Sequence, residues 1–133
     1  LRMLDSSLKQ AIEDSGAYKL LGIRIESAVN GEALLAVDFD PKLTQPMGVA
    51  HGGVMATLAD SAVAIALMGV LKEPHAISTI EMKINYFRPF LQGTMLARAR
   101  IIQKGRSIAV GEVDITDEHG KALGKALMTY KIS

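Results

Sequence analysis

The sequence contains no cysteine, which excludes disulfide bridges, thiolate metal ligands and a cysteine nucleophile. It also lacks an excess of either charge, because the formal net charge is +1 over 133 residues. A nucleic-acid-binding surface would show a basic stripe, so we expect no nucleic-acid partner. Linkers, repeats and low-complexity tracts are absent too, while hydrophobic residues make up 49% of the chain. These absences favour a single folded domain over residues 1–133.

No signal peptide is visible, and we expect a cytoplasmic location. One apolar run, residues 52–71, is long enough to raise a transmembrane interpretation, since about 20 apolar residues span a bilayer. Asp60 lies near the middle of this run, however, and much of the rest is Ala, Gly, Ser and Thr. A buried helix of a soluble protein explains the run better, so we expect no membrane partner.

Hydrophobic periodicity and turn signals predict an α+β fold in which one antiparallel sheet packs on one long helix. The first helix is expected to be capped by Asp5 or Ser6 and ended by Gly16. Asn30-Gly31 is a strong hairpin signal. The predicted elements are a helix over residues 5–15, strands over 21–28 and 32–40, an irregular stretch over 41–50, a helix over 52–71, a strand from 77 to Pro89, and strands over 94–103, 107–116 and 122–132.

Alternation along the strand from residue 77 sorts its side chains onto two faces. One face carries Ile80, Met82, Ile84 and Tyr86, and the other carries Thr79, Glu81, Lys83 and Asn85. Ser78 and Thr79 supply hydroxyl groups at the start of this strand. Since neighbouring residues face opposite sides, at most one of the two is expected to serve a site.

Asp60 is the only charged residue between His51 and Lys72. An unpaired buried charge is costly, so this carboxylate needs a function, a partner such as a nearby Lys or Arg, or access to solvent. Gly52 and Gly53 lie where the helix should begin, and a helix start offers unpaired N–H groups. An acid and an oxyanion site on one element are typical of acyl-transfer or hydrolytic chemistry.

The other residues around the helix start have two interpretations each. The two glycines allow a tight turn, and they also let a ligand approach the backbone closely. His51 is either a helix-start residue with a local hydrogen bond or a group that transfers a proton. Gln45 is either a solvated loop residue or a donor to a carbonyl or a water.

Asp60 lies too far from the start of its own helix for both to act on one substrate atom. Gly52 and Asp60 are eight residues apart, about 12 Å along a helix, whereas an oxyanion donor and a catalytic acid must lie near one reacting carbon. Two such helices packed antiparallel would bring Asp60 of one chain near Gly52 of another. The spacing, together with a helix that is apolar nearly all round, predicts a twofold dimer with two equivalent sites.

Three cationic residues outside this region are candidates for binding an anionic ligand. Lys104-Gly105-Arg106 is either a solvated hairpin turn or a contact for phosphates, and Arg88 has the same two interpretations. His51, His75 and His119 form no cluster with metal-ligand spacing, so we expect no metal.

The sequence resembles the hotdog-fold acyl-CoA thioesterases of the phenylacetate-pathway and thioesterase-superfamily-2 type. The resemblance covers nearly the whole chain and is carried by three segments: Gly48-x-x-His51-Gly52-Gly53 with Leu58-Ala59-Asp60; Thr79-x-Glu81-Met82-x-Ile84-x-Tyr86-x-Arg88-Pro89; and the turn Lys104-Gly105-Arg106.

The resemblance implies a sheet wrapped around a long helix, in dimers and often tetramers, and hydrolysis of an acyl-CoA without a cofactor. It implies that Asp60 is the general base or nucleophile and that the Gly52 N–H of the other subunit polarises the carbonyl. Gln45 stands where many relatives have Asn, and the strand hydroxyl falls on Thr79 or, after a one-residue slip, on Ser78. A non-catalytic acyl-CoA-binding protein is the alternative. The His-centred pattern of the dehydratases that share this fold is absent.

Overall fold

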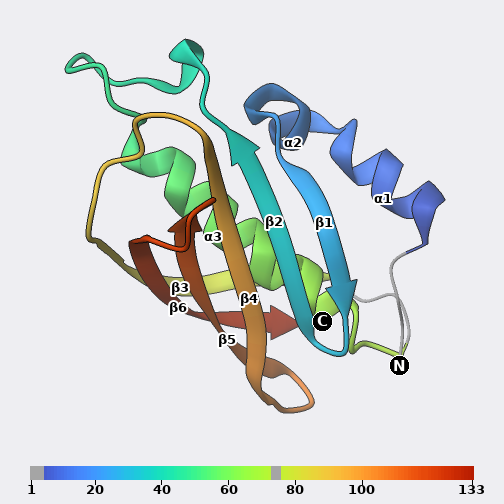
Figure 1. The fold of residues 1–133 in the computed structure, drawn as a ribbon. Helices are drawn as coiled ribbons and strands as arrows, with labels where there is room; N and C mark the ends of the chain where they lie inside the picture. Colours follow the sequence, from blue (N-terminus) through green and yellow to red (C-terminus); the bar gives the residue numbers. More distant parts are fainter. Residues whose placement is uncertain (1–4, 73–75) are drawn as a thin grey trace.

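The computed structural model describes residues 5–72 and 76–133. Six strands form one antiparallel sheet in the order β1-β2-β4-β5-β6-β3, and the helix α3 lies against one face of it (Figure 1). The strands are β1 (Arg24–Val29), β2 (Glu32–Asp38), β3 (Ile77–Tyr86), β4 (Thr94–Lys104), β5 (Ile108–Asp117) and β6 (Ala122–Ile132); the helices are α1 (Ser6–Glu13), α2 (Gly16–Leu21) and α3 (Gly52–Met68), with a 3-10 turn η1 at Pro41–Leu43. The predicted α+β hotdog architecture is confirmed.

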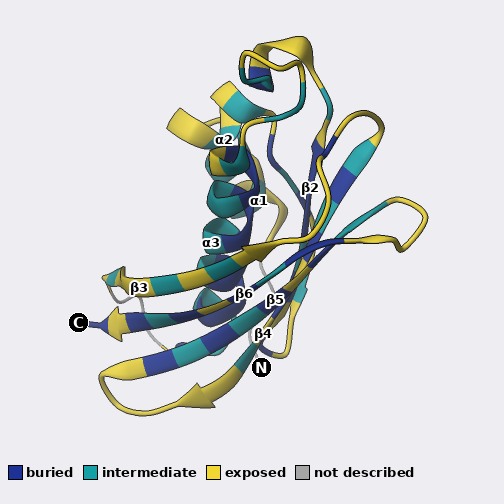
Figure 2. Ribbon diagram, turned by 90° about the vertical axis from the view of Figure 1, so that its left-hand side faces the viewer, coloured by how far each residue is buried: buried dark blue, intermediate teal, exposed yellow. Residues whose placement is uncertain are grey.

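The hydrophobic core lies between α3 and the sheet. Figure 2 shows the buried residues gathered where the helix faces the strands and the exposed residues along the loops and strand ends. Leu58, Ala62 and Leu67 of α3 are fully buried there. The remaining residues of α3 form a stripe that stays partly or fully exposed, and its members are Gly52, Gly53, Ala56, Thr57, Asp60, Ser61, Ala64 and Met68. The described part of one chain therefore leaves one face of α3 incompletely covered.

Local sequence signals set several boundaries as expected. The side chain of Asp5 accepts a hydrogen bond from the amide of Leu8 at 2.8 Å and so caps α1. Asn30 and Gly31 both have positive φ, as a tight hairpin turn between β1 and β2 requires.

The segment after α1 was predicted wrongly. Gly16 does not close a single helix but opens the short helix α2, and the strand expected from residue 21 begins only at Arg24. Gly22, with φ +75°, ends α2. The long helix is also shorter than predicted, since it ends at Met68.

Strict alternation in β3 was wrong as well. The pairing of β3 with β6 shifts register between Thr79 and Glu81, so Ile80 occupies a β-bulge. Thr79 is therefore on the same side as Met82, facing α3, and Ile80 of this edge strand is 53% exposed. Alternation from residue 81 onward holds, because Met82 and Ile84 pack against the core.

The two edges of the sheet differ. On the β1 side, α1 lies beside the strand (Figure 1), and the carboxylate of Glu13 accepts a hydrogen bond from the amide of Ile25 at 2.6 Å. On the other side, β3 pairs with β6 alone among the described residues. An unpaired strand edge offers a row of free N–H and C=O groups to another chain.

Candidate functional site

Asp60 lies half-exposed on the incompletely covered stripe of α3. Its carboxylate oxygen Oδ1 accepts a hydrogen bond from the hydroxyl of Thr79 at 2.8 Å and a second from the hydroxyl of Tyr130. The other oxygen, Oδ2, accepts no hydrogen bond within the described residues, and Asp60 forms no ion pair with them. The acid is thus held by neutral donors, and one of its oxygens is left for a further ligand.

Tyr130 bonds directly to Asp60, and sequence reasoning missed it. It lies on β6 with 4% of its surface exposed, and its hydroxyl also donates to the backbone carbonyl of Asp60 at 2.8 Å. Burial, followed by the hydrogen bond and charge of Asp60, raises the pKa of Tyr130 well above its ordinary value. A signal was available, because a tyrosine at a buried strand position needs a partner for its hydroxyl.

A second tyrosine lies beside this cluster. Tyr18 of α2 packs against the core. Burial raises its pKa, a hydrogen bond with Ser61 opposes that rise, and the charge of Asp60 adds to it. Three elements, α3, β3 and β6, therefore supply the bonded groups at the acid, whereas the Tyr18 hydroxyl of α2 bonds with Ser61 instead.

The start of α3 is the second feature of interest. His51 is its N-cap, and the imidazole Nδ1 accepts a hydrogen bond from the amide of Gly53 at 2.9 Å. The Gly52 amide makes no hydrogen bond to the described residues. The ring of Tyr86 lies over Gly52, since a Cβ built on that glycine would stand 3.2 Å from the ring. The local hydrogen bond that was one interpretation of His51 is present.

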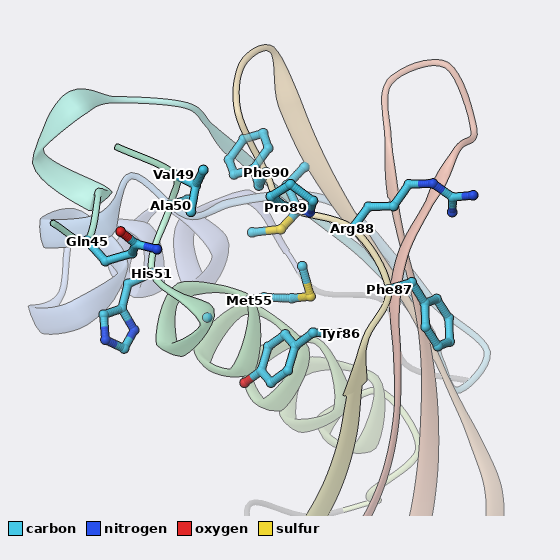
Figure 3. A pocket seen from close by; sticks show the side chains of 12 residues that line it. Gln45, Val49, Ala50, His51, Met55, Tyr86, Phe87, Arg88, Pro89 and Phe90 are labelled. Atoms are coloured by element: carbon cyan, nitrogen blue, oxygen red, sulfur yellow. The ribbon is translucent and has the colours of Figure 1, made fainter. Parts of the chain in front are cut away.

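A cavity of about 320 Å³ opens beside this helix start. Figure 3 shows Gln45 and His51 on one side of it and Tyr86 and Pro89 on the other. Its lining is formed by Gln45, Val49, Ala50, His51, Gly52, Met55, Tyr86, Phe87, Arg88, Pro89, Phe90 and Met95. It is a mainly apolar pocket with a few polar groups, as small-molecule sites commonly are.

Gln45 is positioned by a tight loop. Its backbone carbonyl accepts a hydrogen bond from the Gly48 amide at 2.9 Å, and its side-chain Oε1 accepts one from the Met47 amide. The side-chain oxygen is thereby occupied, and the NH₂ group remains as the free end. Within this cavity Gln45 can act as a donor.

Asp60 does not line the cavity. It lies eight residues beyond Gly52 on the same straight helix, about 12 Å away along its axis. The structure thus brings Thr79 to Asp60, and Gln45, His51 and Gly53 to Gly52, but it keeps the two groups apart within one chain.

The predicted cationic contacts lie elsewhere. Arg88 lines the cavity, yet its guanidinium points away from it (Figure 3) and donates to the carbonyl of Ala122 at 2.8 Å. Lys104 and Arg106 are exposed at the turn between β4 and β5, at the opposite end of the sheet from the loop carrying Gln45 (Figure 1). Lys104 is nine positions along β4 from Met95 in the cavity wall, about 30 Å of strand.

Two further observations concern residues 5–72 and 76–133. They contain no group of three or more His, Cys, Asp or Glu side chains arranged to hold a metal ion; His75 lies outside the described residues. Even α3, their most apolar helix, falls short of what a membrane-crossing helix needs.

Comparison with known proteins identifies the fold and family. Residues 47–124 match the family described as the thioesterase superfamily. The chain is 32% identical to the 1,4-dihydroxy-2-naphthoyl-CoA hydrolase of Listeria monocytogenes, over 81% of this chain and 88% of that protein. It is 30% identical to acyl-coenzyme A thioesterase 13 of Pongo abelii, over 82% and 76%. A solved thioesterase of Haemophilus influenzae superposes with a TM-score of 0.90 at 28% identity, covering 100% of this chain and 95% of the other.

Proposed function

The chain belongs to the thioesterase superfamily, and from this premise we propose that it hydrolyses an acyl-CoA thioester to a free acid and coenzyme A. The names of two relatives, a naphthoyl-CoA hydrolase and an acyl-coenzyme A thioesterase, support this substrate class. The observation that carries the proposal is the carboxylate of Asp60, which has no cationic partner among the described residues and one unoccupied oxygen.

In this proposal the start of α3 binds the thioester carbonyl oxygen and polarises the carbonyl group. The free Gly52 amide and the NH₂ group of Gln45 border one cavity, and together they hold the thioester carbonyl oxygen as negative charge develops on it. His51 contributes through its hydrogen bond to Gly53, which engages the neighbouring amide and leaves that of Gly52 for the substrate. The absence of a side chain on Gly53 gives the ligand room to approach.

Asp60 acts on the attacking group, either as a general base or as a nucleophile. As a general base, its Oδ2 takes a proton from water while the water oxygen bonds to the thioester carbon; the tetrahedral intermediate then collapses, the carbon–sulfur bond breaks, and coenzyme A leaves as a thiolate that accepts the proton. As a nucleophile, Oδ2 would instead attack the carbon, the carbon–sulfur bond would break, and coenzyme A would leave as a thiolate; water would then open the resulting anhydride, releasing the free acid, restoring the Asp60 carboxylate and supplying the thiolate with a proton. Thr79 orients the carboxylate in both routes.

A second copy of the chain completes the site. Asp60 is too far from Gly52 of its own chain to share a substrate carbon, and the stripe that contains it is incompletely covered. Two α3 helices packed antiparallel along these stripes would bring each Asp60 to the other chain's Gly52. The unpaired edge of β3, with Ile80 exposed, lies on the side where such a copy would join the sheet. We therefore propose a homodimer with two shared sites, alone or as half of a tetramer.

Coenzyme A carries phosphates, and we propose that Lys104, Arg106 and Arg88 bind them. Lys104 and Arg106 are about 30 Å along β4 from the cavity wall of their own chain, so in this proposal the turn of another subunit meets the coenzyme. Arg88 lies at the rim of the cavity with its guanidinium directed outward, where it can meet the same anionic group.

A panel of aromatic and aliphatic acyl-CoA substrates tests the function. Thiol release is followed for the wild-type protein and for Asp60→Asn, with coenzyme A affinity measured in parallel. Turnover of one class, lost in the variant, is the expected result. Tight binding of acyl-CoA without turnover of any substrate would instead favour a non-catalytic acyl-CoA-binding protein.

A further inference from the structure

We propose that Tyr130 is a positioning residue for the reaction, because it holds Asp60 so that Oδ2, and not Oδ1, is the reacting oxygen. This inference rests on the proposed function and adds a residue and an atom to it. Tyr130 does not border the cavity at the helix start, and it acts through Asp60 rather than on the substrate.

The geometry is that of a clamp on one residue. The Tyr130 hydroxyl reaches two oxygens of Asp60, the backbone carbonyl at 2.8 Å and the carboxylate Oδ1. A single donor shared between backbone and side chain restricts the torsion that joins them, so the carboxylate is held in one rotamer. Since α3 is anchored in the core, the carboxylate is fixed relative to the sheet.

The hydrogen bonds also make the two carboxylate oxygens unequal. Oδ1 accepts from both Tyr130 and Thr79, while Oδ2 accepts from none of the described residues. Each donated hydrogen bond occupies a lone pair of the oxygen that accepts it. Oδ2 is therefore the oxygen with a free lone pair, and it is the one that takes a proton from water or bonds to carbon.

Burial keeps the clamp in place over the working pH range. Tyr130 is 4% exposed, and its pKa is raised first by burial and then by Asp60, so the hydroxyl stays protonated and remains a donor. Phenylalanine keeps the ring and its packing and removes the donor alone.

Tyr130→Phe is the test, with Tyr18→Phe as the matched control. Tyr18 is also a tyrosine near Asp60, partly buried, but its hydroxyl bonds with Ser61. We expect Tyr130→Phe to lower kcat about tenfold, the lower end of the range for losing a hydrogen bond to a charged group, with KM within twofold. Tyr18→Phe should leave kcat within twofold. In an Asp60→Asn background, Tyr130→Phe should not change the residual rate, because the clamp acts only through the carboxylate.

A readout independent of turnover checks the contact itself. A buried, hydrogen-bonded tyrosine hydroxyl proton should be visible by NMR; it should vanish in Tyr130→Phe and shift in Asp60→Asn. Failure of either change overturns the clamp. A lower melting temperature for Tyr130→Phe with unchanged kcat, beside an inactive Asp60→Asn, overturns the positioning role alone. Full activity in Asp60→Asn overturns the proposed function and this inference with it.

Discussion

Replacing Asp60 with asparagine keeps the shape of the side chain and removes its negative charge. An amide can neither take a proton from water nor attack a carbonyl carbon, so both proposed routes stop. We expect kcat to fall by roughly 10² or more, the usual scale for removing a general base. The helix start remains intact in the variant, so KM should change little.

The stability change is set by the two donors to Oδ1. An asparagine oxygen can still accept from Thr79 and Tyr130, but each bond to a neutral acceptor is weaker by about 1 kcal/mol than a bond to a charged one. Relief of a half-buried, unpaired charge offsets part of that loss. The free energy of unfolding should therefore fall by about 1 kcal/mol, which lowers Tm by about 4 °C for a chain of this size.

Measuring kcat and Tm on the same sample separates the two roles of Asp60. Asp114→Asn is the control, because it removes an equal charge from an exposed pair with Lys125 and should leave kcat unchanged. Asp60→Ala, which also removes both acceptors, should lower Tm further than asparagine does. If Asp60→Asn unfolds readily while its activity per folded molecule survives, the acid is a structural group and the reasoning above is wrong.

Three further outcomes are expected. Sedimentation should show a dimer or a tetramer, and Ile80→Asp at the β3 edge should weaken association and activity together; a fully active monomer would contradict the shared site. Changing both Lys104 and Arg106 to alanine should raise KM in a salt-dependent way with little change in kcat, and a fall in kcat at constant KM would contradict their assignment to the coenzyme. A hydrogen bond from Thr94, followed by the pair with Arg24, holds the pKa of Asp38 below its ordinary value, so its contribution to stability is present above about pH 4 and is lost as pH falls through the lowered pKa. An NMR titration of Asp38 should move to higher pH in Thr94→Val, and no movement would contradict this cause.

The elements that local chemistry specifies were predictable. The capping of α1 by Asp5, the turn at Asn30-Gly31 and the long apolar helix follow from side-chain hydrogen bonding, backbone freedom and hydrophobic burial, which act within a few residues. The errors fell where short-range signals compete. Gly16 is compatible with the end of one helix and with the start of the next. The bulge at Ile80 produces no signal in an alternating pattern, because pairing with the partner strand determines where it forms.

By itself, the sequence determined the antiparallel sheet on a central helix, the isolation of Asp60 in an apolar run, and the separation of Asp60 from Gly52, because helix rise and hydrophobic period are local quantities. Tertiary structure decided which groups contact the acid. Tyr130 is 70 residues from Asp60 along the chain, and Thr79 faces α3 only because the bulge in β3 changes its side of the sheet. Those contacts depend on strand order and register, which are set by packing of the whole core, so residues distant in sequence meet at Asp60 only in the folded chain.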